Sequence, residues 1–241
     1  MRLKKRIANA LGYDLLRSSR THALIERHLE KLFRLHRIDC VLDVGANTGQ
    51  YGEKLLRSGF SGQLHSFEPV EAPFKELAKK AAGVSNWHVY PFALGDEKVE
   101  KKIQVLGQTN LCSFHLPSDY SRSLDSDAFT VAEEQSVEVR RLDEELARIV
   151  RDGYDGSIYL KMDTQGFDLN VFRGASGCLE RIAALQTELS IQPLYEEMPP
   201  FDHVMHEIME AGYKVTGMYP AARDKQNLTI IEFDCVMARA L

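Results

Sequence analysis

The sequence contains little cysteine and no long hydrophobic run. Its four cysteines, Cys40, Cys112, Cys178 and Cys235, lie far apart and form no Cys-x-x-Cys pair, which argues against a disulfide framework or a zinc site. No apolar stretch approaches the roughly 18 residues that a membrane-spanning helix requires. The N-terminus is basic and then amphipathic, without the apolar core and cleavage site of a secretory signal. We therefore expect a cytoplasmic protein with reduced thiols.

The composition also lacks the bias of disordered or fibrous chains, because 44% of the 241 residues are hydrophobic and 27% are charged. The net charge of −5 is unevenly distributed. Residues 1–38 contain ten Lys or Arg against three Asp or Glu, an excess of seven positive charges, so the remainder has an excess of twelve negative charges. An acidic body argues against nucleic acid as a partner, since binding to a phosphate backbone depends on Lys and Arg contacts. The basic segment predicts either a contact with a membrane surface or acidic carrier, or an ordinary solvated helix face.

The N-terminal segment and the remainder of the chain have different patterns. Residues 1–38 are predicted to form an arm of two amphipathic helices, because apolar side chains recur there at helical spacing. Residues 39–241 are predicted to form one α/β domain. Within this domain, residues 93–156 interrupt the regular order of elements, and we expect them to form an insertion on the substrate side.

Strand-like and helix-like segments alternate in the body. This alternation predicts parallel strands in one sheet, with helices on both faces. The predicted strands are residues 40–44, 63–67, 86–92, 157–162, 183–191, 213–219 and 229–238. The predicted helices of the body, outside the insertion, are residues 49–58, 71–82, 167–180 and 200–211.

The most informative segment is VLDVGANTGQYGEKLL, in which a strand ends near Asp43 and a turn with Gly45 and Gly49 precedes a helix. Glycines allow a tight turn and a close approach of the backbone to a ligand at a helix N-terminus. The spacing differs from the G-x-G-x-x-G of dinucleotide sites. A pyrophosphate requires surroundings without negative charge, so the carboxylate of Asp43 disfavours it. The same carboxylate favours a ligand with a positive centre. The alternative is a glycine turn that serves packing only.

A second acid supports the ligand interpretation. Glu68, in LHSFEP, follows the next predicted strand and lies nineteen residues after Gly49. A carboxylate at that position can accept hydrogen bonds from both hydroxyls of a ribose, although alone it could equally be a solvated loop residue. Together, Asp43 and Glu68 favour an adenosine ligand with a cationic tail, and S-adenosylmethionine fits.

These segments resemble the FkbM-type methyltransferases, a branch of the class I S-adenosylmethionine-dependent methyltransferases, over roughly residues 38–240. The resemblance implies a Rossmann-like fold with a mostly parallel seven-stranded sheet and a final antiparallel strand. It also implies O-methylation of a hydroxyl on a sugar, glycan or natural product. The matching stretches are DVGANTGQY (43–51), FEP (67–69), FALGD (92–96), VEVRRLDEEL (137–146), LKMDTQGFDLNVFRGA (160–175) and LQTELSIQPLY (185–195).

The resemblance implies roles for individual residues. The methionine end of the cofactor is expected at Asp43, Gly45, Ala46, Asn47, Thr48 and Gly49. Glu68 is expected at the ribose, Ala93 and Leu94 at the adenine, and Asp163 at the sulfonium and substrate. Many relatives have an acid where this chain has Gln165, so a second carboxylate is missing at that place.

Methyl transfer to a hydroxyl benefits from a general base. Asp163 is the first candidate, because a carboxylate that follows a parallel strand faces the ligand crevice. Its alternative role is to order the loop or bind the ammonium of the cofactor. Other candidates are Glu188, His115 and His203, each with a structural role as the alternative. We expect no metal, because Gln165 leaves no convincing set of oxygen ligands around Asp163.

Two other functions stay open at this point. One is a cofactor-binding subunit without catalysis, since a fold never guarantees an activity. The other is an NAD-linked oxidoreductase, which the missing G-x-G-x-x-G disfavours. The sequence leaves the acceptor and the oligomeric state undetermined.

Overall fold

A seven-stranded sheet forms the centre of the computed structural model, which describes residues 22–150 and 154–241. The strand order is β3-β2-β1-β7-β8-β10-β9, and β10 runs antiparallel to both of its neighbours while the other pairs are parallel. This arrangement confirms the expected Rossmann-like, mostly parallel seven-stranded sheet. The strands are β1 (Ile38–Val44), β2 (Gln63–Phe67), β3 (Trp87–Tyr90), β7 (Ser157–Met162), β8 (Ile182–Ser190), β9 (Lys214–Arg223) and β10 (Ile230–Ala238).

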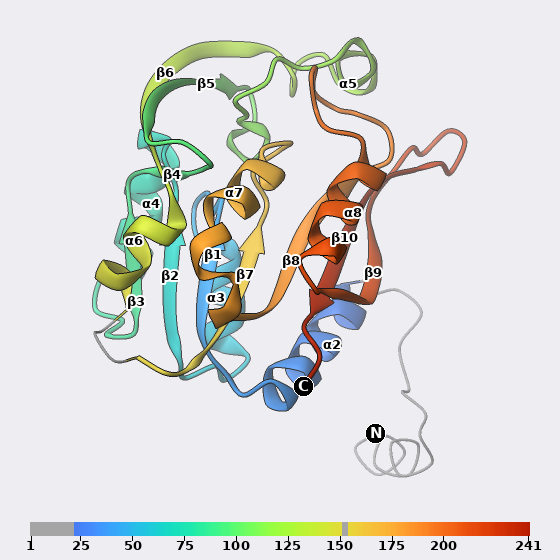
Figure 1. The fold of residues 1–241 in the computed structure, drawn as a ribbon. Coiled ribbons are helices and arrows are strands. Elements are labelled where there is room, and N and C mark those ends of the chain that lie inside the picture. The colour runs from blue at the N-terminus through green and yellow to red at the C-terminus, as the bar shows by residue number, and fades with distance from the viewer. Residues whose placement is uncertain (1–21, 151–153) are drawn as a thin grey trace, which may run out of the picture.

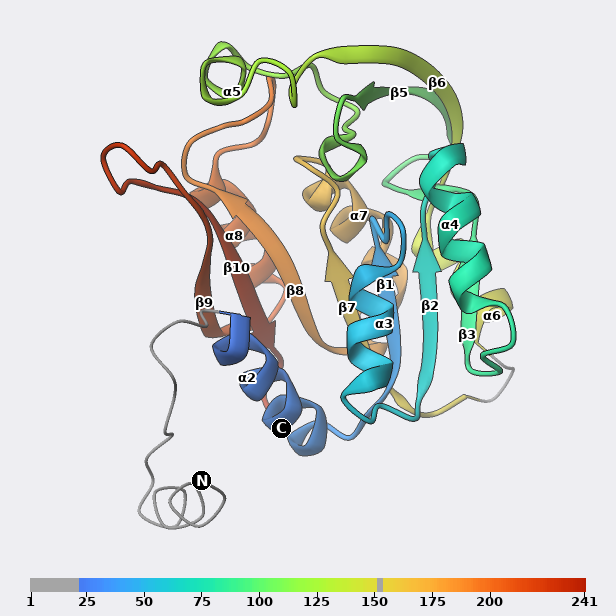
Figure 2. The ribbon, with the colours of Figure 1, turned by 180° about the vertical axis from the view of Figure 1, so that it is seen from behind.

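Helices cover both faces of the sheet (Figure 1 and Figure 2). One face carries α2, α3 and α4, and the opposite face carries α6, α7 and α8; their apolar side chains form two separate cores with the strands between them. These helices are α2 (His22–Leu35), α3 (Gln50–Arg57), α4 (Glu71–Ala81), α6 (Leu142–Ile149), α7 (Asp168–Gly174) and α8 (Phe201–Glu210).

The alternation of side chains along each strand explains the two cores. In β7, Ile158, Leu160 and Met162 belong to the core under α6, α7 and α8, whereas Tyr159 belongs to the core under α2, α3 and α4. The next residue on that second face is Lys161, which is buried at the carboxyl end of the strand. A fully buried strand therefore places one charged side chain beside the loops that follow the parallel strands.

The second helix of the predicted arm is present as α2. Its residues Ile25, Leu29 and Leu32 are buried in the core that α2 shares with the sheet. The first predicted helix lies within residues 1–21, outside the described residues, and so does most of the positive charge of the arm. None of the helices within 22–150 and 154–241 has the length and apolar character that spanning a bilayer requires.

The predicted insertion forms a separate three-stranded sheet of order β4-β6-β5 and lies at the carboxyl edge of the main sheet, at the top of Figure 1. The backbone of Ser118 donates to the carbonyl of Leu194, and that of Glu196 to the carbonyl of Leu116, which ties the insertion to the segment after β8. Its elements are β4 (Ala93–Leu94), β5 (Val99–Leu106), η1 (Thr109–Leu111), α5 (Asp119–Leu124) and β6 (Val131–Arg140), followed by α6.

One predicted helix is shorter than expected. The segment 167–180 divides into α7, which ends at Gly174, and the 3₁₀ helix η2 (Ser176–Arg181). A Cβ atom on Gly174 would lie 1.9 Å from the carbonyl oxygen of Gly95. The backbone of the insertion thus passes against the end of α7, a long-range contact that helical periodicity does not report.

Candidate active site

The chain turns sharply after β1, where Gly45 and Asn47 have φ angles of 77° and 47°. A Cβ atom on Gly45 would lie 1.9 Å from the main-chain oxygen of Asp163, because the amide of Asp163 donates to the carbonyl of Val44 at 3.1 Å. Only glycine combines this left-handed backbone with so close an approach. The loops after β1 and β7 therefore meet at the carboxyl edge of the sheet.

A cavity of about 1300 Å³ opens at this edge, between the loops that follow β1, β2 and β7 and the insertion. Seven of the ten residues predicted for the site line it, namely Gly45, Ala46, Asn47, Glu68, Ala93, Leu94 and Asp163. Asp43, Thr48 and Gly49 are not among the lining residues. A Cβ atom on Gly49 would lie 2.8 Å from the Leu77 side chain and 3.0 Å from the Trp87 ring, so Gly49 packs against α4 and β3.

Glu68 follows β2 and is buried, with 6% of its surface exposed. Its Oε2 accepts the amide of Asn47 and its Oε1 accepts the amide of Val70, both at 2.8 Å. Burial raises the pKa of Glu68 to about 7. Each carboxylate oxygen has a further lone pair, so Glu68 can still accept two hydroxyls from a ligand in the cavity. This arrangement fits a ribose.

The wall next to Glu68 is apolar. Ala93 and Leu94, in the short strand β4, are 5% and 1% exposed and line the cavity together with Phe67 and Ile103. An apolar slot beside a carboxylate that binds a ribose suits the flat face of an adenine. The residues present therefore fit both parts of an adenosine.

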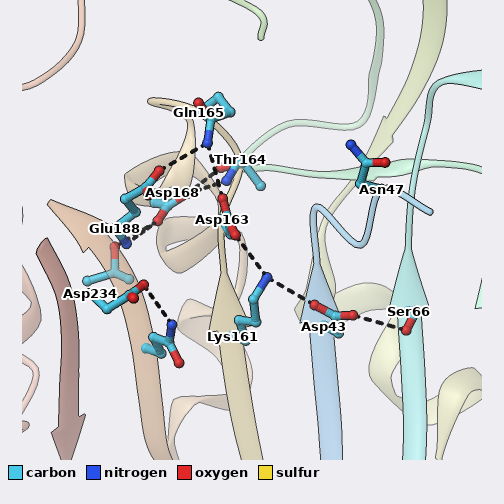
Figure 3. A network of polar contacts seen from close by, with 12 residues as sticks. Asp43, Asn47, Ser66, Lys161, Asp163, Thr164, Gln165, Asp168, Glu188 and Asp234 are labelled. Carbon is cyan, nitrogen blue, oxygen red and sulfur yellow. Dashed lines mark hydrogen bonds and ion pairs between the residues drawn. The ribbon is translucent and has the colours of Figure 1, made fainter. Parts of the chain in front are cut away.

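Asp43 lies beneath the cavity floor and is completely buried. In Figure 3, its carboxylate lies between the Ser66 hydroxyl and Lys161; Ser66 donates to it at 3.3 Å, and the Lys161 Nζ is 3.1 Å from its Oδ1. The positive group that the structure places against Asp43 is thus a side chain of the protein itself. The sequence analysis did not single out Lys161, although a lysine inside an otherwise apolar strand signals a buried ion pair.

Lys161 also reaches Asp163, the predicted catalytic residue. Its Nζ lies 3.3 Å from Oδ2 of Asp163. Burial opposes the charged form of Lys161, but the carboxylates of Asp163 and Asp43 outweigh it and raise the pKa of the lysine well above its usual value. The Asp163 side chain is 41% exposed and faces the cavity. Of the two acids that Lys161 joins, Asp163 is the one that a ligand can reach.

Gln165 connects Asp163 to a second carboxylate. Its Nε2 donates to Oδ1 of Asp163 at 3.2 Å and to Oε2 of Glu188 at 3.0 Å (Figure 3). The backbone of Gln165 is left-handed, with φ 53°, a conformation that persists only where the surroundings enforce it. A glutamate at this position would bring a third carboxylate beside Asp163 and Glu188. The Gln165 amide instead donates a hydrogen bond to each of these two carboxylates.

The side-chain oxygen of Gln165 contacts Tyr195, a buried residue to which the sequence analysis gave no role. The Tyr195 hydroxyl lies 2.9 Å from Oε1 of Gln165 and 2.7 Å from the carbonyl of Leu111. Ser113 donates to the Gln165 carbonyl at 2.6 Å. The insertion is therefore held directly against the loop that carries Asp163. Tyr195 is the last residue of the stretch LQTELSIQPLY, and its place in that stretch was the signal in the sequence that could have pointed to it.

The other candidate bases occupy different positions. Glu188 is partly buried, and burial together with the neighbouring Glu232 raises its pKa well above the usual value. His203 is exposed on α8 and lies 3.7 Å from Glu207. His115 packs near the ring of Phe167. None of these three candidates is among the lining residues of the cavity.

Asp168 adds a fourth acid to this region, and its oxygens are occupied. They accept the amide and hydroxyl of Thr164, the hydroxyl of Thr187 and the amide of Glu188, at 2.5–2.9 Å. Across residues 22–150 and 154–241, no three His, Cys, Asp or Glu side chains are arranged to hold a metal ion. The carboxylates of this region are bonded to protein donors.

Residues 43–215 match the family described as "Methyltransferase FkbM domain". No curated protein gives a significant match to the chain. Similar solved structures include an rRNA methylase from Streptococcus thermophilus (11% identity, 85% of this chain and 88% of that chain, TM-score 0.45). A fibrillarin pre-rRNA processing protein from Methanococcus jannaschii is also similar (13%, 84% and 67%, TM-score 0.45). A third is fibrillarin from Aeropyrum pernix with natively bound S-adenosylmethionine (10% identity, 83% of this chain and 66% of that chain, TM-score 0.47).

These similarities correct the expectation that nucleic acid is excluded as a partner. The similar solved structures are described as an rRNA methylase and a pre-rRNA processing protein. Net charge was a poor basis for the exclusion, because a binding surface depends on the local arrangement of charges and not on their sum.

The family match spans most of the chain, from the end of β1 to the start of β9, and includes all ten residues predicted for the site. The protein belongs to the FkbM methyltransferase family, and S-adenosylmethionine is its methyl donor.

Proposed function

We propose that the protein methylates a hydroxyl of a sugar, glycan or natural-product acceptor, with Asp163 as the general base. The observation that carries this proposal is the Asp163 carboxylate, which faces the cavity and is held by Lys161 and Gln165. When bound, S-adenosylmethionine supplies a methyl group on a positively charged sulfur. A hydroxyl is a poor nucleophile until its proton leaves, so the carboxylate assists the transfer.

The residues of the site have different roles. Glu68 and the wall at Ala93 and Leu94 hold the adenosine, and the turn at Gly45 brings the backbone close to the remainder of the cofactor. Asp163 would accept the proton of the acceptor hydroxyl, and bound S-adenosylmethionine would supply the methyl group that replaces this proton and would become S-adenosylhomocysteine. Holding the reacting groups in line is itself a large part of such catalysis.

Asp163→Asn tests the role of this carboxylate. Loss of a general base lowers turnover by about 10²–10⁴-fold, and we expect the affinity for S-adenosylhomocysteine in titration calorimetry to change by less than about threefold, because the amide keeps the shape of the side chain. Asp202→Asn, on the exposed first turn of α8, is the control. An equal loss of turnover and affinity would show that Asp163 anchors the cofactor instead.

The acceptor class can be tested with S-adenosylmethionine that carries a labelled methyl group. Cell extract is incubated with the protein and then separated into small-molecule, glycan and RNA fractions. We expect label in a small-molecule or glycan fraction, on oxygen by NMR, and about a hundredfold less with Asp163→Asn. Label in the RNA fraction, or on nitrogen or carbon, would contradict the proposed acceptor but not the methyltransferase activity.

A further inference from the structure

The cavity extends well beyond the residues that fit the cofactor. From Asp163 it continues past Tyr51 and Lys161 into a groove between α2 and α3, and it reaches the turn that follows α3 at Gly59. Its volume of about 1300 Å³ exceeds the roughly 300–1000 Å³ that is usual for the site of one small ligand. The same cavity therefore has space for a second ligand beside the cofactor.

The part of the groove nearest Asp163 is polar. It contains the Tyr51 ring, over which the Lys161 ammonium lies at 5.1 Å, and the side chains of Gln186 and Asp234, which are joined at 2.9 Å. The Tyr51 hydroxyl is buried and has no hydrogen-bond partner within the described part of the chain. The Asp163 carboxylate, at the edge of this part, is the accessible group that a hydroxyl-bearing head can meet.

Farther from Asp163, the groove combines apolar side chains with charged ones, among them Glu30, Arg34 and Asp39. This part, called the tail groove below, runs alongside the eight residues of α3, a length of about 12 Å. Its apolar side chains come from α2, β1, α3 and the turn after α3: Ile25, Leu29, Phe33, Ile38, Leu55 and Phe60.

The rim of the tail groove can open. Lys54 of α3 and Glu26 of α2 form an ion pair of 2.7 Å between the two helices, and both side chains are about half exposed. Exposed pairs of this kind contribute little to stability. The pair therefore presents a small barrier to a ligand that enters from the side.

We infer that the methyl acceptor is an amphiphile: its hydroxyl-bearing head lies beside Tyr51 and Asp163, and an elongated apolar tail lies in the tail groove. The inference rests on the proposed function, because it places the acceptor hydroxyl at Asp163. Continuity is the decisive observation, since the tail groove opens into the cavity at Asp163 and not onto a separate surface. Each methylene that leaves water for such a groove strengthens binding by about fourfold.

The test uses n-alkyl β-D-glucosides from hexyl to dodecyl, below their micelle-forming concentrations. Each is titrated by calorimetry into the full-length protein saturated with S-adenosylhomocysteine. We expect the affinity to rise by about threefold to fourfold per methylene until the groove is filled. A flat series would overturn the inference. Because S-adenosylhomocysteine binding is measured first, that failure is separate from a failure of the cofactor assignment.

Two variants of α3 locate the tail. Leu55→Trp fills the tail groove and should abolish the dependence on chain length, whereas Arg57→Trp adds the same side chain at an exposed position of the helix outside the cavity lining and should preserve it. If Leu55→Trp fails to bind S-adenosylhomocysteine, Ser58→Trp replaces it; that change narrows the far end and should end the rise at a shorter chain. A full dependence in the groove variants would mean that the tail binds elsewhere, which contradicts the inference.

Discussion

At the scale of single residues, the site depends on carboxylates whose surroundings differ. Glu68 is buried, and both of its oxygens accept backbone amides, yet burial keeps its pKa near 7. Asp163 is more exposed and has a lysine and an amide as partners. The first suits hydrogen bonds to a bound ligand, and the second suits exchange of a proton with an acceptor. Their environments, and not their chemistry, separate the two roles.

The affinity for S-adenosylhomocysteine should depend on the protonation of Glu68. The ionised carboxylate accepts hydroxyls more strongly than the neutral acid, and its pKa is about 7. We therefore expect the affinity to rise between pH 6 and pH 8. Glu68→Gln should bind about 10–100-fold more weakly at pH 8, the cost of losing charge-assisted hydrogen bonds, with little change with pH. Titration calorimetry between pH 6 and pH 8 measures these affinities, with Glu71→Gln on the exposed start of α4 as the control. If the affinity of Glu68→Gln for S-adenosylhomocysteine still changed with pH, another group would be responsible for the titration.

At the scale of elements, the site is the place where the ends of β1 and β7 meet. Lys161 and Asp43 are direct neighbours in the register of these two strands, and their ion pair joins the strands on the face that carries α3. Gly45 allows the backbones to approach just beyond the strand ends. The geometry of the cavity floor is therefore a property of the strand pair.

Gly45→Ala should disrupt this meeting point. The new Cβ atom would lie 1.9 Å from the Asp163 carbonyl in a backbone with φ 77°, so strand ends and loop must separate. We expect a loss of more than about 3 kcal/mol in the free energy of unfolding, together with weaker S-adenosylhomocysteine binding. Gly59→Ala is a matched control, because its φ is 97° and no atom lies within 4 Å of the added Cβ; it should cost about 1 kcal/mol. Similar losses in urea unfolding would refute the close-approach argument.

The Lys161–Asp43 pair makes a second prediction at this scale. Lys161→Met leaves the buried Asp43 carboxylate without its cation, and such a change costs about 3–5 kcal/mol. Asp43→Asn in the same chain removes the stranded charge, so the double variant should recover part of the loss. Urea unfolding of the two single variants and the double variant measures the coupling. Additive losses would show that the two residues act independently.

At the scale of the whole molecule, buried carboxylates make stability depend on pH. Burial raises the pKa values of Glu68 and Glu232 to about 7, against a usual value of 4.5. The folded state then binds these protons more tightly than the unfolded state, so the stabilisation is complete below pH 4.5 and is lost as the pH rises through 7. Burial lowers the pKa of His65 to about 4, and that group acts in the opposite sense, costing stability as the pH falls below 6.5.

We therefore expect the free energy of unfolding to fall between pH 6.5 and pH 8 by about 1–3 kcal/mol. Glu232→Gln keeps an acceptor for the Ser190 hydroxyl, which donates to Glu232 at 2.8 Å, and should remove part of this fall. Urea unfolding at both pH values, with and without the substitution, is the measurement. Equal stability of the unsubstituted protein at pH 6.5 and pH 8 would mean that these carboxylates are ionised throughout.

The sequence predicted the elements more accurately than their contacts. The glycines after β1 and the acid after β2 are local signals, and both segments lie at the cavity. Tyr195 and Lys161 escaped notice, because their importance comes from Gln165 and Asp43, which are distant in the chain. The predicted helix at 167–180 was too long for the same reason, since its end packs against the insertion.

By itself, the sequence determined the alternation of strands and helices, the mostly parallel sheet and the nature of the cofactor. Periodicity and turn chemistry act between neighbours in the chain, so they can be recognised without a fold. Only the tertiary structure decided that the Asp43 charge is neutralised by Lys161 while Asp163 stays accessible to a ligand, and that the cavity at Asp163 continues into the tail groove. Both depend on strand register and on how α2 packs beside α3, because contacts between distant segments are selected by packing and not by local pattern.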